Sequence, residues 1–179
     1  MRRSRKKGQI WVETVIYTLI GLAIIGIVLA VAKPKIDDKK SEILIEQAIE
    51  SLKNIDQKIG IIENAGPGNR RTIEVELGSG VINIDAENDK ISWVLDSHVQ
   101  YSELDTEIGL GKLLITTTKG NPFTVTIDAI QSADIQFEDD QTSEVVKTLT
   151  KSPLPHTIVI ENMGTNELTG NIIIMFRVA

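Results

Sequence analysis

Cysteine is absent from the 179-residue sequence, which excludes a disulfide framework and any chemistry that depends on a thiol. Histidine is scarce as well. The two histidines, His98 and His156, lie far apart, and neither has a neighbouring pattern of metal ligands. We therefore expect no metal site and no cofactor.

Sequence signatures of enzymes are missing too. The chain has no Gly-x-Ser-x-Gly motif and no local grouping of serine, histidine and aspartate. The glycines of Gly78-Ser-Gly80 and Gly109-Leu-Gly111 are typical of turns, because neither pair precedes a helix in a βαβ unit. The acidic run Asp85–Lys90 lacks the glycine and terminal glutamate of a calcium loop, so it predicts a solvated hairpin. We expect that the protein is not an enzyme.

The formal net charge of −6 conceals an uneven distribution. Five of the 19 basic residues lie within residues 1–8, which leaves 14 basic residues against 25 acidic ones in the rest of the chain. An acidic body disfavours nucleic-acid binding, which requires a basic face. It is compatible with a solvated extracellular surface.

A long apolar run follows the basic segment. Residues 14–32 (TVIYTLIGLAIIGIVLAVA) contain no charged side chain. At about 1.5 Å per helical residue, they approach the roughly 30 Å thickness of a bilayer core. By the positive-inside rule, the basic residues 1–8 would stay in the cytoplasm and the acidic body would face outward.

Glu13 is the one charged side chain between Ile10 and Ala32. A carboxylate in a membrane costs about 2.5–3.5 kcal/mol at the centre of a helix on insertion scales, and less near its end. A charge at this depth calls for a partner. Glu13 therefore indicates a function beyond simple anchoring.

Three interpretations of this N-terminal segment are open. A plain signal anchor explains its length and orientation but leaves Glu13 unexplained. A cleaved secretory signal is suggested by Ala30-Val31-Ala32, which has the small-x-small form that signal peptidase accepts. Against it, the apolar run exceeds the usual length of about 7–15 residues and contains an acid. The third interpretation depends on the order of the residues around Gly8.

A basic leader ends in Gly8, Gln9 follows, Glu13 is the fifth residue counted from Gln9, and the apolar helix comes next. This order resembles the class III signal of type IV prepilins, in particular that of archaeal type IV pilin-like proteins. The resemblance covers about residues 1–35. Trp11 departs from it, because many archaeal pilins have serine at the third mature position. In that family a membrane prepilin peptidase cuts after the glycine, so Gln9 would become the new N-terminus.

The resemblance implies a structural role in a surface filament used for adhesion. Subunits of the family polymerise through the apolar helix, with an assembly ATPase and a platform membrane protein as partners. Before assembly, the precursor would lie in the cell membrane with its N-terminus in the cytoplasm. After cleavage, the amine of Gln9 would lie one helical turn from Glu13 and could neutralise it within the chain or in an adjacent subunit. Pairing between subunits would also fix their axial register.

A second helical segment is predicted beyond the membrane. Pro34 either kinks the helix, by removing a backbone hydrogen bond, or starts a second helix. After it, an apolar stripe with alternating spacings of three and four predicts an amphipathic helix over 35–63. The stripe consists of Ile45, Ala48, Leu52, Ile55, Ile59 and Ile62. It could pack on the chain's own downstream domain or on neighbouring helices, and we favour the first. The breakers at 65–69 end the helix.

Residues 71–179 change to a period of two with many turn residues, which predicts an antiparallel β-sandwich. The resemblance to archaeal pilins implies an immunoglobulin-like sandwich. The predicted strands are Thr72–Leu77, Gly80–Asp85, Lys90–Asp96, Val99–Ser102, Lys112–Thr118, Phe123–Ile130, Ala133–Phe137, His156–Asn162 and Asn171–Val178. The last should be central and buried on both faces, because its run of apolar residues does not alternate. Residues 138–155 are expected to form an exposed loop or a short helix.

The sequence thus predicts an α+β protein in three parts. These are a basic leader (1–8), an N-terminal helix (9–63, apolar over 9–32 and amphipathic over 35–63) and a β-rich outer domain (71–179). The favoured function is that of a pilin precursor whose mature form polymerises with itself. The alternative is a single-pass, membrane-anchored extracellular binding or adhesin domain that never polymerises.

Overall fold

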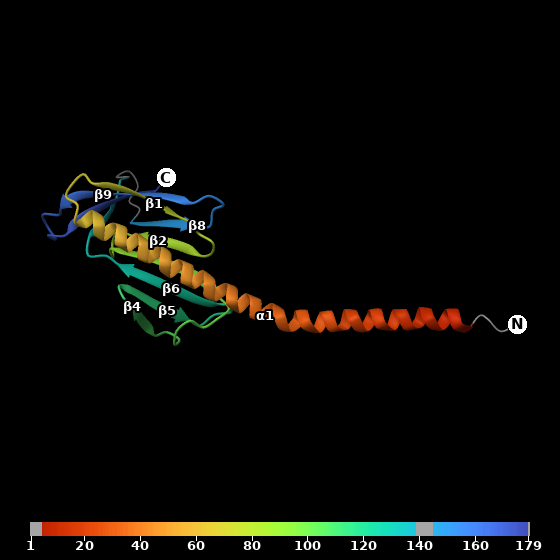
Figure 1. Cartoon of the computed structure of the whole chain (residues 1–179). Helices are drawn as coiled ribbons and strands as arrows, with labels where there is room; N and C mark the ends of the chain where they lie inside the picture. The colour runs from red at the N-terminus through yellow and green to blue at the C-terminus, as the bar shows by residue number, and fades with distance from the viewer. Residues whose placement is uncertain (1–4, 139–144, 179) are drawn as a thin grey trace. The chain divides into compact units, whose positions relative to one another are not determined.

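The computed structural model describes the backbone of residues 5–138 and 145–178, and the side chains from residue 11 onward within those ranges. The described chain has an α+β fold, with one long helix followed by ten strands (Figure 1). It divides into two compact units, Met1–Lys40 and Ser41–Ala179.

Helix α1 spans Arg5–Glu63 and contributes residues to both units. The helix continues through Pro34, which therefore does not start a second helix; the kink at this residue stays a prediction. The helix ends at Glu63, as the breaker residues predict. Gly66 and Gly68 follow with φ angles of 48° and 85°, which glycine adopts without the steric penalty of a Cβ atom.

Two sheets form the rest of the second unit, as predicted for a sandwich, and their strands are mostly antiparallel. Sheet A has the order β1–β9–β10–β7, made of β1 (Arg70–Val75), β9 (His156–Thr165), β10 (Ile172–Val178) and β7 (Asp134–Phe137). Sheet B has the order β4–β5–β6–β3–β2–β8, made of β4 (Glu107–Leu110), β5 (Leu113–Thr118), β6 (Phe123–Ile130), β3 (Lys90–Ser97), β2 (Val81–Asp85) and β8 (Val146–Thr150). Every pair in sheet B is antiparallel, whereas β7 and β10 of sheet A run parallel.

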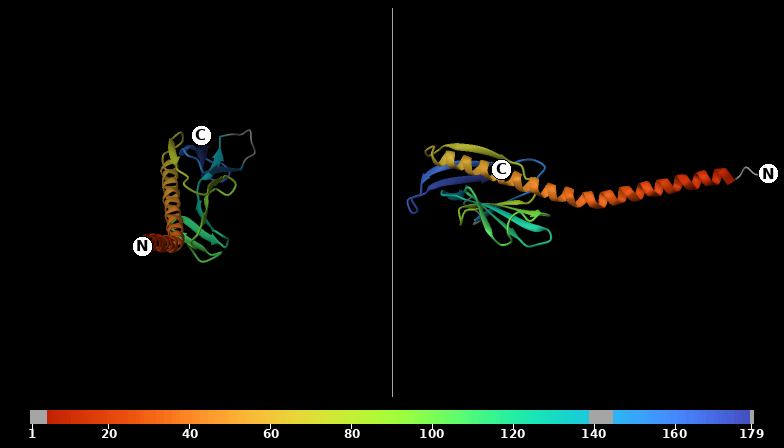
Figure 2. Two further views of the ribbon diagram at one scale, coloured as in Figure 1. Left: turned by 90° about the vertical axis from the view of Figure 1, so that its right-hand side faces the viewer. Right: turned by 60° about the horizontal axis from the view of Figure 1, so that its bottom comes forward.

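Residues 41–63 of α1 lie along the two sheets (Figure 2). Their buried side chains and those on the inner faces of both sheets form one hydrophobic core. The six residues of the predicted stripe are at most 2% exposed. The prediction that this stripe packs on the chain's own β domain is therefore confirmed. A fully buried isoleucine or leucine contributes about 1.5–3 kcal/mol, so the five such residues of the stripe hold this part of the helix firmly on the sheets.

Eight of the nine predicted strands are present, and the prediction of Val99–Ser102 as a strand is wrong. There, the Ser97 hydroxyl donates to the Val99 carbonyl (2.7 Å) and accepts from the Val99 amide (3.0 Å). Such local bonding offers the backbone an alternative to a strand ladder. Two strands were not predicted. β4 is exposed at every position, and β8, in the segment expected as a loop or short helix, buries only Leu149.

β10 occupies the central position predicted for it, between β9 and β7. The prediction that both of its faces are buried is wrong for one face. Ile174 and Phe176 are fully buried in the core, whereas Ile173 and Met175 on the other face are only partly buried. The apolar run of this central strand therefore has one face buried in the core and one face that is only partly buried.

Candidate membrane and assembly segment

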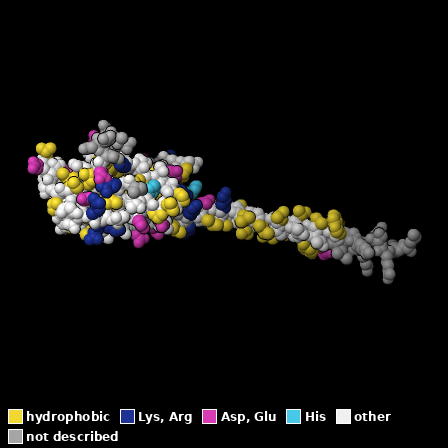
Figure 3. All heavy atoms as spheres, turned by 90° about the horizontal axis from the view of Figure 1, so that it is seen from above, with side chains coloured by type: hydrophobic (Ala, Val, Ile, Leu, Met, Phe, Trp, Pro, Cys, Tyr) yellow, Lys and Arg dark blue, Asp and Glu magenta, His cyan; other side chains and the backbone are white. Residues whose placement is uncertain are grey.

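The apolar run lies on the helix with its side chains exposed. The large hydrophobic side chains from Trp11 to Val31 are between 38% and 71% exposed, on every side of the helix. Figure 3 shows the hydrophobic side chains along the face of the helix that is in view. A helix that is apolar all round needs apolar surroundings. Among the described residues, one helix is long and apolar enough to cross a membrane, and it contains this run. The segment is consistent with membrane anchoring.

Glu13 lies at the start of this apolar surface. The only hydrogen bond of its carboxylate within the described chain is a long one from the Tyr17 hydroxyl, one turn further on, at 3.5 Å from Glu13 Oε1. In contrast, the Thr18 hydroxyl donates to the Thr14 carbonyl at 2.8 Å, so this polar group is satisfied inside its own helix. Of these groups, the carboxylate of Glu13 has the greatest need for a partner outside the helix.

The predicted processing site lies at the edge of the described residues. Gly8 and Gln9 fall within the helical backbone of α1, but the Gln9 side chain lies outside the described part of the chain. Residues 1–4 of the predicted basic leader lie outside it as well. The pairing of the Gln9 amine with Glu13 therefore stays a prediction.

Asn162 on β9 joins the end of the helix to sheet A. Its Nδ2 donates to the Ile62 carbonyl at 2.9 Å, and its Oδ1 accepts from the Gly164 amide at 2.8 Å. The side chain is 1% exposed, so both partners satisfy groups that would otherwise be costly to bury. The last turn of a helix has carbonyl groups without helical partners, and Asn162 supplies a donor for one of them.

Asp134 on β7 anchors the turn between β9 and β10. Its carboxylate accepts hydrogen bonds from Thr169 Oγ1 (2.6 Å), Asn171 Nδ2 (2.8 Å) and Asn166 Nδ2 (2.6 Å). These bonds, that of Thr169 above all, lower the pKa of Asp134 below its usual 3.8, although burial acts in the opposite direction. At the tip of this turn, Leu168 is 95% exposed.

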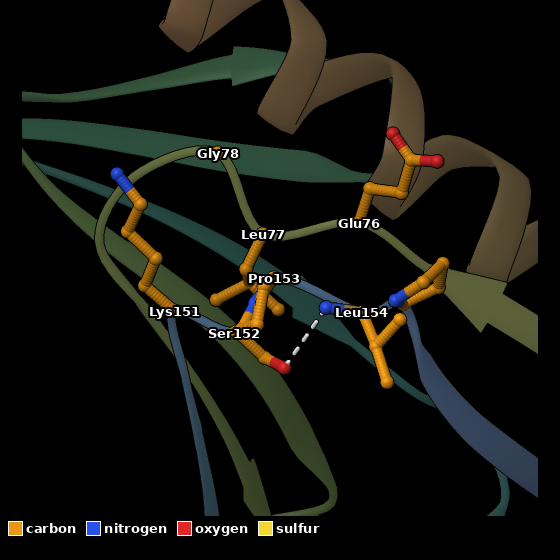
Figure 4. A pocket seen from close by; sticks show the side chains of 8 residues that line it. Glu76, Leu77, Gly78, Lys151, Ser152, Pro153 and Leu154 are labelled. Carbon is orange, nitrogen blue, oxygen red and sulfur yellow. Dashed lines mark hydrogen bonds between the residues drawn. The ribbon is translucent and has the colours of Figure 1, made fainter.

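An open hollow of about 400 Å³ lies beside the other end of β9 (Figure 4). The loop after β1 (76–78) and the loop before β9 (151–155) form its walls. Pro153 and Pro155 restrict the backbone of the second loop, and the Leu154 amide donates to Ser152 Oγ at 3.2 Å. The restricted backbone of this loop therefore largely fixes the shape of the hollow.

The acidic turn at Asp85 joins β2 to β3, which confirms the predicted hairpin. Asp85 Oδ1 accepts from the amides of Glu87 (2.9 Å) and Asn88 (3.1 Å), and Asp85 Oδ2 accepts from the Asn88 side chain (2.8 Å). These bonds use the carboxylate to shape the turn. Within the described residues, no cluster of three or more acidic, histidine or cysteine side chains could hold a metal ion.

Comparison of the chain with models of protein families, with curated proteins and with solved structures finds no match. What the chain does is therefore inferred from its own residues.

Proposed function

We propose that this chain is the precursor of a structural subunit of a type IV pilus-like surface filament. The observation that carries the proposal is an exposed, apolar helix surface from Trp11 onward that includes one carboxylate, Glu13. A plain anchor requires the apolar surface but has no use for the acid. A polymer of such helices uses both, because neighbouring helices cover the apolar surface and a neighbouring amine neutralises Glu13.

In this proposal, a prepilin peptidase cuts between Gly8 and Gln9 on the cytoplasmic side of the membrane. An assembly ATPase and a platform membrane protein then move the helix from lipid into the growing filament. The β-rich outer domain coats the filament and serves in adhesion. These partners and this use come from the resemblance of residues 1–35 to type IV prepilins.

The energetics of this transfer give Glu13 its role. Lipid tails are as apolar as leucine side chains, so apolar contact alone gives little reason for a helix to leave the membrane for a helical bundle. A carboxylate that lacks a partner in lipid and gains an amine in the bundle changes that balance. The same ion pair would set how far one subunit is displaced along the axis from the next.

The first test is the intact mass and N-terminal residue of the protein isolated from its native cells. We expect a start at Gln9, or at its cyclised form, because cleavage after Gly8 creates the amine that the proposal requires. A start at Met1 would indicate a permanent anchor. A start at Lys33 would indicate a secreted domain and would exclude the filament.

The second test removes the carboxylate. We expect Glu13→Ala and Glu13→Gln subunits to enter the membrane normally and to lose filament yield by about tenfold or more, because a buried ion pair is broken. Thr18→Ala is the matched control, because Thr18 lies on the same helix but its hydroxyl bonds only to the Thr14 carbonyl among the described contacts. Filament yield is measured by electron microscopy and by sedimentation of sheared filaments. Normal filaments from both Glu13 variants would refute the proposed role of this residue.

The second candidate function is a membrane-anchored binding or adhesin domain that never polymerises. The observation that favours it is the complete burial of the stripe from Ile45 to Ile62 in the chain's own core, which leaves the outer domain independent of neighbouring subunits. An uncleaved start at Met1, together with normal surface display of Glu13→Ala, would favour this candidate.

A further inference from the structure

The turn that carries Leu168 and the hollow lie at opposite ends of sheet A. Strand β9 joins them, because His156 follows the hollow-forming loop 151–155 and Thr165 precedes the turn 166–170. At about 3.3 Å per residue, its ten residues separate the two features by roughly 30 Å. In Figure 1 the turn lies at the far left of the domain and the hollow-forming loops at its right.

The Leu168 turn is built to hold its shape. A single exposed leucine is ordinary on a protein surface. Here, however, three side chains in or directly after the turn converge on the nearly buried Asp134, and the Leu168 amide donates to Asn166 Oδ1 at 3.0 Å. An apolar side chain on a rigid support loses little conformational entropy when it binds, which is the property of an anchor residue.

The hollow offers the complementary surface. The exposed Pro153 and Leu154 give it apolar walls above the buried Leu77, and the exposed Lys151 lies at one side. In Figure 4 the Lys151 amine lies far from the carboxylate of Glu76, the other charged residue of the lining. Glu167, which is exposed beside Leu168 in the turn, has the charge that Lys151 would attract.

We propose that Leu168 of one copy inserts into the hollow of a second copy that lies further along the filament, with Glu167 facing Lys151. This inference rests on the proposed function. The two surfaces differ and lie at opposite ends of the domain, so the contact is head-to-tail. Such a contact repeats into an open helical assembly unless the rotation between copies closes a ring.

The direction of the contact matches that of the helix within the outer unit. Near the hollow, a Cβ atom on Gly78 would lie 3.4 Å from Leu44. Near the turn, Asn162 bonds to Ile62. Residues 44–62 of α1 therefore run from the hollow end to the turn end, and copies joined head-to-tail would repeat along this part of the helix. One leucine alone gives a weak contact. Helix polymerisation holds the two surfaces at a high effective concentration, so that the contact forms in the filament.

The test uses the absence of cysteine from the natural chain. In the full-length protein, Leu168→Cys combined with Leu154→Cys should give a ladder of covalent multimers when filaments are mildly oxidised. Each single variant should give no species larger than a dimer. The matched control combines Leu154→Cys with Ile130→Cys. Ile130 is 52% exposed and lies near Ser132, which bonds to Glu63 at the turn end of the domain, so it should give no ladder.

A charge exchange gives a second measurement in the same background. Lys151→Glu or Glu167→Lys alone should reduce the yield of the ladder several-fold, and the two changes together should restore it. Unchanged thermal unfolding of the detergent-solubilised subunits shows that the variants fold. If natural filaments form but the cysteine pair yields no ladder, or the control pair yields an equal one, the contact is wrong and the proposed function stands. If the unaltered protein forms no filaments, both are wrong.

Discussion

At the scale of single residues, two buried polar side chains, Asn162 and Asp134, hold parts of the domain together. Asn162 and Asp134 each bond to segments that lie far away in the sequence, and each fixes the end of an element. No sequence pattern marks either residue, because asparagine and aspartate occur mostly in exposed turns. Glu13, in contrast, stands out in the sequence because it is the one charged side chain between Ile10 and Ala32.

Asp134 should make the outer domain sensitive to acid. Its pKa is lowered in the folded chain by its hydrogen bonds with Thr169, Asn171 and Asn166. A lowered pKa stabilises the fold at pH values above the usual value of 3.8, and this stabilisation is lost as the pH falls through the folded value. We therefore expect the natural chain to lose more stability below about pH 4 than Asp134→Asn does.

The measurement is thermal unfolding of both proteins in detergent between about pH 2 and pH 6. At pH 6, Asp134→Asn should cost about 2 kcal/mol, because its amide N–H groups cannot accept from the same donors. The difference between the two proteins should shrink as the pH falls. A constant difference across the range would contradict the role of the ionised carboxylate.

At the scale of elements, segments with a regular hydrophobic period are predicted correctly from the sequence, and segments without one are missed. The helix end at Glu63 and the buried stripe followed from breaker residues and regular spacing. Strands β4 and β8 are the outer strands of sheet B and bury little, so their sequences carry almost no alternation. The parallel pairing of β7 with β10 depends on strand order, which local sequence does not determine.

The candidate sites divide in the same way. Gly8, Gln9 and Glu13 lie within six consecutive residues, so the sequence alone suggested them. The Leu168 turn and the hollow can be recognised only once the fold is known. Asp134 lies 32 to 37 residues from its bonding partners in the turn, and loops 76–78 and 151–155 meet only because β1 pairs with β9.

The two faces of β10 should differ in their contribution to stability. Phe176 is 0% exposed in the core, whereas its neighbour Met175 faces the half-open side. We expect Phe176→Ala to cost about 3–5 kcal/mol, from lost burial and the cavity that remains, and Met175→Ala to cost less than half as much. Thermal unfolding of the full chain in detergent measures both. Equal costs would mean that the second face is covered as completely as the first.

At the scale of the whole molecule, the chain combines two units that depend on different surroundings. Met1–Lys40 carries the exposed apolar surface, and Ser41–Ala179 has a core of its own. We expect heating in detergent to unfold the second unit in one cooperative transition while the micelle keeps residues 11–32 helical. A helix in an apolar medium retains its hydrogen bonds because no water competes for them.

Circular dichroism can follow the two units separately. The near-ultraviolet signal of Trp93, which is 3% exposed, should disappear in the transition while part of the helical signal at 222 nm remains. A Trp11→Phe variant should keep the near-ultraviolet signal, and a Trp93→Phe variant should lose most of it. Complete loss of the helical signal in the same transition would show that the two units unfold as one.

The seam between the helix and the sheets also has a mechanical meaning. The buried stripe from Ile45 to Ile62 lies along the helix axis, and Asn162 holds its far end. A pull on the helix along that axis would load all of these contacts in shear at the same moment, whereas a pull across it would open them one at a time. The buried stripe therefore resists tension along the axis of residues 45–62 better than tension across it.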